Sequence, residues 1–157
     1  QKLDGFNVKN GELEIKTQGV LTLDGFPGKQ FELTCEVEVS GGSCLALQVA
    51  TNKKGIPLLG IMPTHVMTGN YEASKLQNNI QMNNKEAKPH GHKGGGWMTL
   101  KVVLANGWLD VSCDGKAVFK DLVPGGVEFS QFGLMCLGIN GNTKPSAKLR
   151  NVILFAP

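Results

Sequence analysis

Three histidines are the side chains of this 157-residue chain best suited to metal or acid–base chemistry: His65, His90 and His92. His90 and His92 flank a single glycine, so an extended backbone would place both rings on one side. Two imidazoles in this arrangement suit a divalent metal ion if His65, Glu72 or an asparagine oxygen completes the coordination shell. An exposed polar loop produces the same short pattern. We therefore expect no bound cofactor, and a divalent metal at His90 and His92 is the open alternative.

Paired carboxylates are the second arrangement that could carry out catalysis, because most glycosidases use two of them. Glu32, Glu36 and Glu38 occupy even positions between apolar residues and therefore share one face of a predicted strand. The solvent face of any half-buried strand has this composition, and the Glu-x-Asp-x-x-Glu pattern of laminarinase-like sandwiches is absent from the sequence. Catalytic residues are therefore not assigned.

A sugar-binding site requires fewer features than a catalytic site. It needs an aromatic face for the apolar side of a pyranose, surrounded by planar polar groups for the hydroxyls. Trp97 and Trp108 are the aromatic candidates, although tryptophans in or beside strands often pack in a core. The polar and phenolic candidates come mostly from one region of the chain: His65, Asn70, Tyr71, Glu72, Gln77, Gln81, Asn83 and Asn140.

The composition limits which partners the chain can have. Net charge is only +3, the lysines are scattered and Arg150 is the single arginine, which opposes nucleic-acid binding. No apolar run approaches the roughly 18 residues of a membrane span. The chain begins at Gln1 without a methionine, a hint of processing, so we expect an extracellular or periplasmic protein.

Four cysteines are present and none has metal-type spacing. All of them fall in apolar, strand-like runs, where a free cysteine acts as a small hydrophobe. Buried thiols are the expectation, and the three possible disulfide pairings stay open.

The elements that must position these candidates are strands. Apolar and polar residues alternate from Phe31 to Val39, the pattern of a strand with one buried face. Ser40–Ser43 then turns the chain into a run from Cys44 to Ala50, which predicts an antiparallel hairpin or a related corner. Asp114-Gly115 predicts a type I′ turn between two further strands.

About ten strands are predicted in all, and helical periodicity is absent, so we expect one all-β domain, an antiparallel two-sheet sandwich of the concanavalin A-like or jelly-roll kind. The predicted strands are 13–17, 20–23, 31–39, 44–50, 55–62, 97–104, 108–113, 116–119, 133–139 and 147–155. Residues 63–96 break the rhythm of short strands and are interpreted as an irregular region that holds the site, with a short strand at 77–82 as an open alternative.

Several segments resemble one family of concanavalin A-like domains, the 3-keto-disaccharide hydrolases. The similar segments are its strand and hairpin patterns at 10–15, 19–22, 31–33, 96–103, 110–118 and 148–153. The chain lacks the family's Asn-Ser-Gly strand at 42–48, and Tyr71-Glu72 alone corresponds to a Tyr-Glu segment. The resemblance implies the sandwich fold and hydrolysis of 3-keto-glycosides.

Because one sandwich scaffold hosts lectins, binding modules and hydrolases, fold does not decide the activity. A non-catalytic carbohydrate-binding module with an oligosaccharide or polysaccharide partner is the first hypothesis, and a catalytic domain in the same full-length protein would support it. A glycoside hydrolase of the 3-keto type and a structural or protein-binding sandwich are the alternatives.

Overall fold

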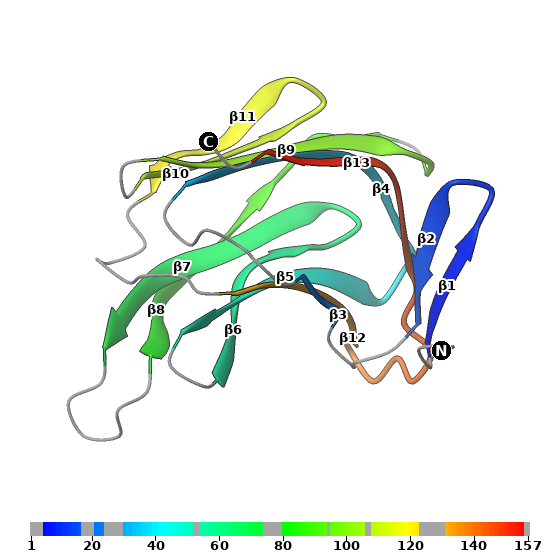
Figure 1. Ribbon diagram of the computed structural model, residues 1–157, viewed down its shortest axis with the longest axis horizontal. Coiled ribbons are helices and arrows are strands. Elements are labelled where there is room, and N and C mark those ends of the chain that lie inside the picture. The colour runs from blue at the N-terminus through cyan, green and yellow to red at the C-terminus, as the bar shows by residue number, and fades with distance from the viewer. Residues whose placement is uncertain are drawn as a thin grey trace.

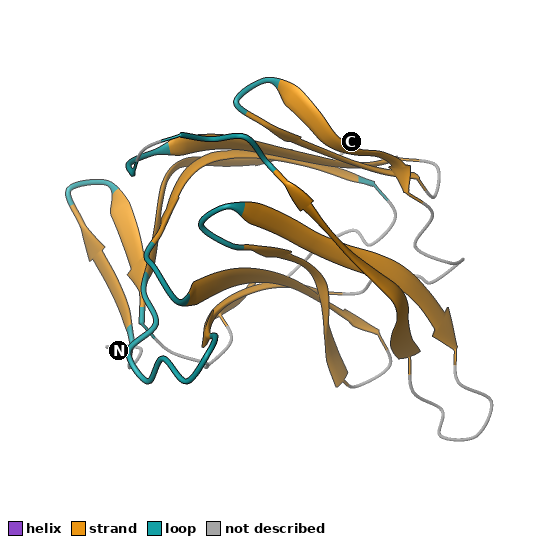
Figure 2. Ribbon diagram, turned by 180° about the vertical axis from the view of Figure 1, so that it is seen from behind, coloured by secondary structure: helices purple, strands orange, loops and turns teal. Residues whose placement is uncertain are grey.

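The computed structural model describes residues 5–16, 21–23, 30–51, 54–73, 80–93, 95–105, 108–122 and 131–155. Every regular element in these ranges is a strand, and the strands form two antiparallel sheets that face each other (Figures 1 and 2). The predicted two-sheet β-sandwich is confirmed. None of the described residues forms a helix that is long and apolar enough to cross a membrane.

Within the described residues, one sheet has seven strands and the other has six. The seven-stranded sheet runs β1 (Phe6–Lys9), β2 (Glu12–Ile15), β13 (Ala147–Phe155), β4 (Phe31–Val39), β9 (Met98–Ala105), β10 (Trp108–Cys113) and β11 (Lys116–Leu122). The six-stranded sheet runs β3 (Leu21–Leu23), β12 (Gln131–Gly138), β5 (Ser43–Thr51), β6 (Lys54–Ile61), β7 (His65–Ala73) and β8 (Ile80–Pro89).

The hydrophobic core lies between the inner faces of the two sheets. In β4 the odd-numbered residues Phe31, Leu33, Cys35 and Val37 are each at most 2% exposed, as the alternating sequence pattern predicts. Side chains from the facing sheet, including Leu45 and others of β5, β6 and β12, complete the same core cluster. Each fully buried residue of this size contributes about 1.5–3 kcal/mol, so the alternation is the main determinant of the fold.

The turn between β10 and β11 has the geometry that its sequence demands. Asp114 has φ of 49° and Gly115 has φ of 77°, both in the left-handed region that a type I′ turn requires. β9, β10 and β11 are consecutive neighbours in the sheet and form a meander.

The chain changes sheet between β4 and β5, so the hairpin interpretation of 31–50 is wrong and the corner interpretation is correct. Ser43, which is fully buried, fixes this corner. Its backbone N–H donates to the Ser40 carbonyl at 3.1 Å, and its hydroxyl accepts from the Ser146 N–H at 3.0 Å. The turn is therefore tied to the segment that leads into β13.

The interpretation of 63–96 as irregular is wrong for much of its length. β7 and β8 occupy 65–73 and 80–89 and pair with each other along most of this span. Their sequences lack the strict alternation of β4, which is why the pattern does not reveal them. Among the described residues of this region, only 63–64, 90–93 and 95–96 lie outside strands.

All four cysteines are free and buried, which confirms the expected thiols. Burial raises the pKa of Cys35 and Cys113 to about 12 and that of Cys44 and Cys136 to about 11. Cys35 and Cys113 lie in the seven-stranded sheet, and Cys44 and Cys136 lie in the six-stranded sheet.

Candidate functional site

The outer face of the seven-stranded sheet carries charged residues in cross-strand rows. Because the odd residues of β4 point into the core, its glutamates point outward. The register aligns Glu12, Arg150, Glu36 and Thr99 across β2, β13, β4 and β9. Opposite charges thus alternate across neighbouring strands, an arrangement that stabilises a sheet face.

Trp97, which directly precedes β9, lies under the only arginine of the chain. The guanidinium carbon of Arg150 is 4.1 Å from the centroid of the Trp97 ring, and the ring is half-buried. Arg150 also donates from Nε and Nη2 to the two carboxylate oxygens of Glu36, at 3.2 and 3.1 Å. The side-chain amide of Asn151 donates to Glu36 as well. These four side chains hold one another in a single geometry.

The hydrogen bonds from Arg150 and Asn151 determine what Glu36 can do chemically. The hydrogen bonds from Arg150, followed by that from Asn151, lower the pKa of Glu36 below its usual value. A glycosidase acid needs a raised pKa instead. Glu36 is therefore unsuited to the acid role in the carboxylate pair considered with Glu38.

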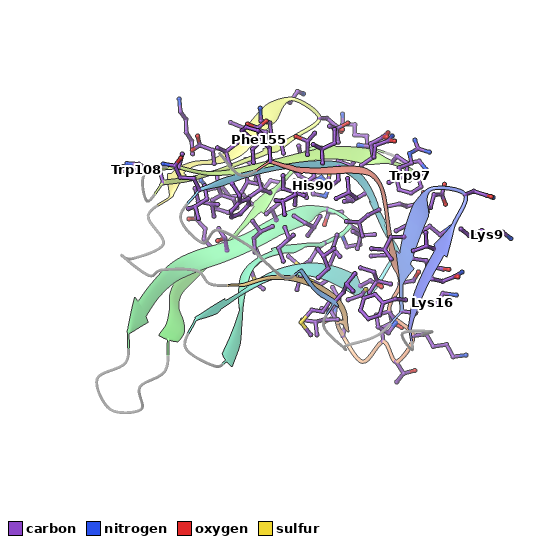
Figure 3. All side chains as sticks on the ribbon, in the orientation of Figure 1. Lys9, Lys16, His90, Trp97, Trp108 and Phe155 are labelled. Carbon is purple, nitrogen blue, oxygen red and sulfur yellow. The ribbon has the colours of Figure 1, made fainter. Side chains whose placement is uncertain are left out.

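Trp108 lies on the same outer face, at the other end of β9. It pairs with Ala105, is 48% exposed, and precedes Leu109, whose side chain is fully buried in the core. Phe155 of β13 is 60% exposed and pairs with the outward-facing Glu32. Figure 3 shows Trp108, Phe155 and Trp97 along this side of the molecule. We call these three residues the aromatic track.

The other predicted sugar-binding residues lie on the opposite sheet. Asn70, Tyr71 and Glu72 are in β7, where their backbones pair with Asn83, Met82 and Gln81 of β8. The structure thus brings five of the predicted residues onto one strand pair, although their side chains lie outside its described part. Gln77 lies outside the described residues altogether.

His65 lies on the same strand pair, opposite Pro89 of β8, whereas Asn140 lies outside both groups. His65 begins β7, and its Nδ1 lies 2.8 Å from the Thr64 hydroxyl. Asn140 follows β12 with φ of 54°, so its backbone forms part of a turn. Neither residue joins the aromatic track.

A pocket of about 340 Å³ lies at one end of the sandwich, among the turns that connect the sheets. Its volume is within the range of small-molecule sites. We call it the end pocket. Its lining is mainly apolar or glycine, with two histidines and a threonine: Val37, Val39, Gly41, Met62, Pro63, Thr64, His90, His92, Gly95, Gly96 and Met98.

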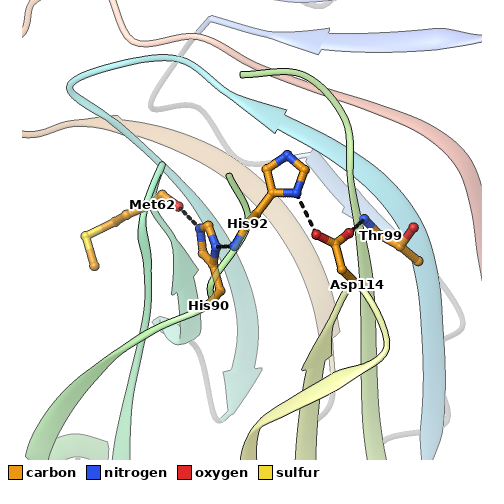
Figure 4. Close-up of polar contacts among 5 residues, drawn as sticks. All are labelled: Met62, His90, His92, Thr99 and Asp114. Carbon is orange, nitrogen blue, oxygen red and sulfur yellow. Dashed lines mark hydrogen bonds and ion pairs between the residues drawn. The ribbon is translucent and has the colours of Figure 1, made fainter. Parts of the chain in front are cut away.

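The two histidines of the end pocket belong to one chain of hydrogen bonds, shown in Figure 4. His90 Nε2 donates to the Met62 carbonyl at 3.0 Å, and His90 Nδ1 accepts from the His92 backbone N–H at 3.1 Å. His92 Nδ1 lies 2.6 Å from Asp114 Oδ2. The Thr99 N–H donates to the other oxygen of Asp114 at 3.0 Å. These hydrogen bonds thus connect the six-stranded sheet to the seven-stranded sheet.

Sequence reasoning missed Asp114 as a partner of His92, because the two residues are 22 positions apart. The hydrogen bond from His92 is the largest influence that lowers the pKa of Asp114. The proposed metal pair is not set up for shared coordination: both nitrogens of His90 are engaged, and the two ring centroids are 6.3 Å apart. No group of three or more potential metal ligands occurs among the described residues.

Comparison with known proteins identifies the fold and no family. No family model matches the chain, and no curated protein is detectably similar in sequence. The structure resembles the botulinum neurotoxin type G receptor-binding domain, with a TM-score of 0.64 and 10% identity over 96% of this chain and 40% of that one. Membership in the 3-keto-disaccharide hydrolase family is therefore not shown.

Glycan-active enzymes share the same sandwich. A Trypanosoma rangeli sialidase matches with a TM-score of 0.64 and 14% identity, over 96% of this chain and 26% of that one. The alginate lyase AlgAT5 of polysaccharide lyase family 7 matches with a TM-score of 0.61 and 10% identity, over 99% and 83%. The chain spans less than half of the first two structures. At these identities the likeness concerns the fold alone.

Proposed function

We propose that this domain binds a neutral oligosaccharide or polysaccharide along the outer face of β13, β4, β9 and β10, without acting on it. The observation that carries the proposal is the aromatic track. Aromatic rings supply flat apolar surfaces for the faces of sugar rings, and polar groups beside them supply hydrogen bonds to the hydroxyls. This face presents both, and each of its three rings is at least partly exposed.

The dimensions of the track suit an extended chain of sugars. Trp97 precedes β9 by one residue, and Trp108 pairs with Ala105 at the end of β9. At 3.2–3.4 Å per residue, the two tryptophans lie about 25 Å apart along the strand. Phe155 lies on this face two strands away from β9, on β13. An oligosaccharide of several units is needed to contact more than one of these rings.

Charge balance on this face favours a neutral ligand. Three outward glutamates on β4 are matched by Lys101, Lys148 and Arg150 on its neighbours. Lys101 forms an ion pair with Glu32 at 3.0 Å, and Arg150 is committed to Glu36. An anionic glycan would have to break these pairs. Arg150 uses only two of its five N–H groups on Glu36, so others can donate to neutral hydroxyls.

The sialidase and the alginate lyase are consistent with a sugar partner, and the short span of the chain within the sialidase is consistent with an attached catalytic domain. Such a partner would also suit an extracellular or periplasmic location. The hydrolase alternative has less support, because the lowered pKa of Glu36 opposes an acid role for that residue. Tyr71, Glu72 and Asn70 on β7 are candidates for a second contact surface.

The test is calorimetric titration with neutral and uronic-acid oligosaccharides of four to eight units. Trp108→Ala and Phe155→Ala should each weaken binding of a neutral glycan about 10- to 100-fold, since a buried aromatic face contributes about 1.5–3 kcal/mol. Val8→Ala is the matched control, because Val8 is 74% exposed on β1 at the edge of the same sheet.

Circular dichroism verifies that each variant is folded. Failure of the parent to bind any neutral oligosaccharide would overturn the proposal. Equal affinity of the parent and both ring variants would overturn it as well, because the ligand would then lie elsewhere on the molecule.

A further inference from the structure

The outer face of the β1–β2 hairpin carries a second hollow, at the end of the seven-stranded sheet beside β13 (Figure 1). Its volume is about 270 Å³, a little under the usual range of drug-sized sites, so it suits a single sugar ring. We call it the polar hollow, because every side chain that lines it is polar or charged: Asn7, Lys9, Asn10, Glu12, Glu14 and Lys148. Its lining is thus the opposite of that of the end pocket, which is mainly apolar or glycine.

The register of the sheet places the polar hollow beside one end of the aromatic track. Ile15 of β2 belongs to the core, so Glu12 of the same strand points to the outer face only if the odd and even positions alternate, as they do in β4. Glu12 pairs with Arg150, whose guanidinium lies over Trp97. Three strand spacings of 4.7–4.9 Å separate β2 from β9, so the hollow lies about 14 Å across the sheet from Trp97. Figure 3 shows Lys9 and Trp97 at the same end of the molecule.

Several polar groups of the hollow are accessible and not engaged elsewhere. Asn7 and Asn10 are exposed, and Glu12 is half-buried, so a ligand on the outer face can reach all three side chains. Within the described part of the chain, none of these three side chains forms a hydrogen bond or an ion pair. Glu14 is the exception in the lining, because its carboxylate lies 3.2 Å from Nζ of Lys16. The hollow therefore offers a free carboxylate between two free amides.

The mixture of donors and acceptors defines the class of ligand. The Glu12 carboxylate only accepts hydrogen bonds, the ammonium groups of Lys9 and Lys148 only donate them, and the two asparagine amides do both. A sugar hydroxyl donates and accepts, so it can satisfy each of these groups. A carboxylate or sulfate has no donor for Glu12 and is repelled by it, and an ammonium group is repelled by the two lysines. The lining thus favours a neutral ligand with several hydroxyls.

We propose that the polar hollow binds one neutral sugar unit of the glycan whose other units contact the aromatic track, with two neighbouring ring hydroxyls donating to the Glu12 carboxylate. The amides of Asn7 and Asn10 bond to further hydroxyls of the same unit. This inference rests on the proposed function, because it assigns the hollow to the same glycan. The two parts of the surface differ in their chemistry: the aromatic rings contact the apolar faces of sugars, and the polar hollow recognises their hydroxyls.

A first test needs no variant: ¹H–¹⁵N NMR of the parent protein during titration with neutral oligosaccharides of four to eight units. The side-chain amide signals of Asn7 and Asn10 should move as the ligand binds. The signal of Asn142 is the control and should stay in place, because its side-chain amide donates to the Gly42 carbonyl. Binding without movement of either Asn7 or Asn10 would overturn the inference.

Two substitutions remove the proposed contacts without disturbing the fold. Glu12→Gln keeps the size of the side chain and removes the charge that accepts from the hydroxyls, so affinity for the oligosaccharide should fall about tenfold. Asn10→Gly removes one amide, suits the φ of 52° at this position, and should weaken binding about threefold. Both variants should keep the parent's melting temperature. Glu86→Gln removes the same charge from an exposed position on β8 and should bind within twofold of the parent.

Failure of this inference and failure of the proposed function give different results in calorimetric titration. If Trp108→Ala weakens binding and Glu12→Gln stays within twofold of the parent, the aromatic track is correct and the polar hollow is not part of the site. If Glu12→Gln weakens binding and Trp108→Ala and Phe155→Ala do not, the hollow is supported and the track is wrong. Equal losses in Glu12→Gln and Glu86→Gln would overturn the hollow, because the effect would then come from net charge alone.

Discussion

Gly138→Ala should destabilise the domain far more than the addition of one methyl group normally does. Gly138 ends β12, and a Cβ built on it would lie 1.9 Å from the backbone oxygen of Asn142 and 3.1 Å from the carbonyl carbon. Neither contact can be relieved by turning a side chain, because both atoms belong to the backbone. The turn that contains Asn142 would have to move by about 1.5 Å to reach ordinary van der Waals separation.

The expected cost follows from the hydrogen bonds that such a movement breaks. The Asn142 N–H donates to the Ile139 carbonyl at 3.2 Å, and its side-chain amide donates to the Gly42 carbonyl at 2.9 Å. The Ile139 N–H also donates to the Gly42 carbonyl, at 2.9 Å. At about 1 kcal/mol per bond, the free energy of unfolding should fall by about 3 kcal/mol. The melting temperature should fall by about 6–12 °C for a chain of this length.

Urea unfolding followed by circular dichroism measures this difference. Gly41→Ala is the matched control, since Gly41 lies in the neighbouring turn, a Cβ added to it would have nothing within 4 Å, and it has no positive φ. Its free energy of unfolding should stay within about 0.5 kcal/mol of the parent's. If Gly138→Ala also stayed within that range, the packing of the 139–146 turn against β12 would have to be different from that described.

Two further predictions concern the hydrogen bonds that His90 and His92 form. Because its hydrogen bond with His92 lowers the pKa of Asp114, the stability that this pair contributes is present above about pH 4 and is lost as pH falls through the lowered pKa. Urea unfolding between pH 2 and 6 should therefore show a weaker pH dependence for Asp114→Asn than for the parent; equal slopes would contradict this. Chelator treatment should leave the melting temperature unchanged, because both nitrogens of His90 are occupied, and a rise with added zinc ion that disappears in His90→Gln would refute that reasoning.

Local sequence patterns predict the strands that bury one face in the core and expose the other face to solvent. The 31–39 alternation corresponds to β4 with the same boundaries, and Asp114-Gly115 forms the predicted turn. β7 and β8 escape prediction because their sequences do not alternate. The change of sheet after β4 stays undecided at the level of sequence, since Ser40–Ser43 suits a hairpin and a corner equally well.

The site is harder to predict because its contacts join distant positions. Glu36 and Arg150 are 114 residues apart and meet only because β4 and β13 are neighbours in the sheet. Sequence patterns indicate which residues face outward, but the register between strands decides which of them touch. Trp97 and Trp108 are identified by residue type alone, whereas the arginine over Trp97 depends on that register.

The buried thiols can report on the opening of the core between the two sheets. A thiol with a pKa of 11 or 12 is almost entirely protonated at neutral pH, and only the thiolate reacts at a useful rate with an alkylating reagent. Modification must therefore wait until the surrounding strands separate. Because Cys35, Cys113 and Cys136 belong to the one core between the two sheets, mass spectrometry of the labelled positions would time the separation of the sheets at three places. No probe has to be introduced, because the native cysteines are themselves the labelling sites.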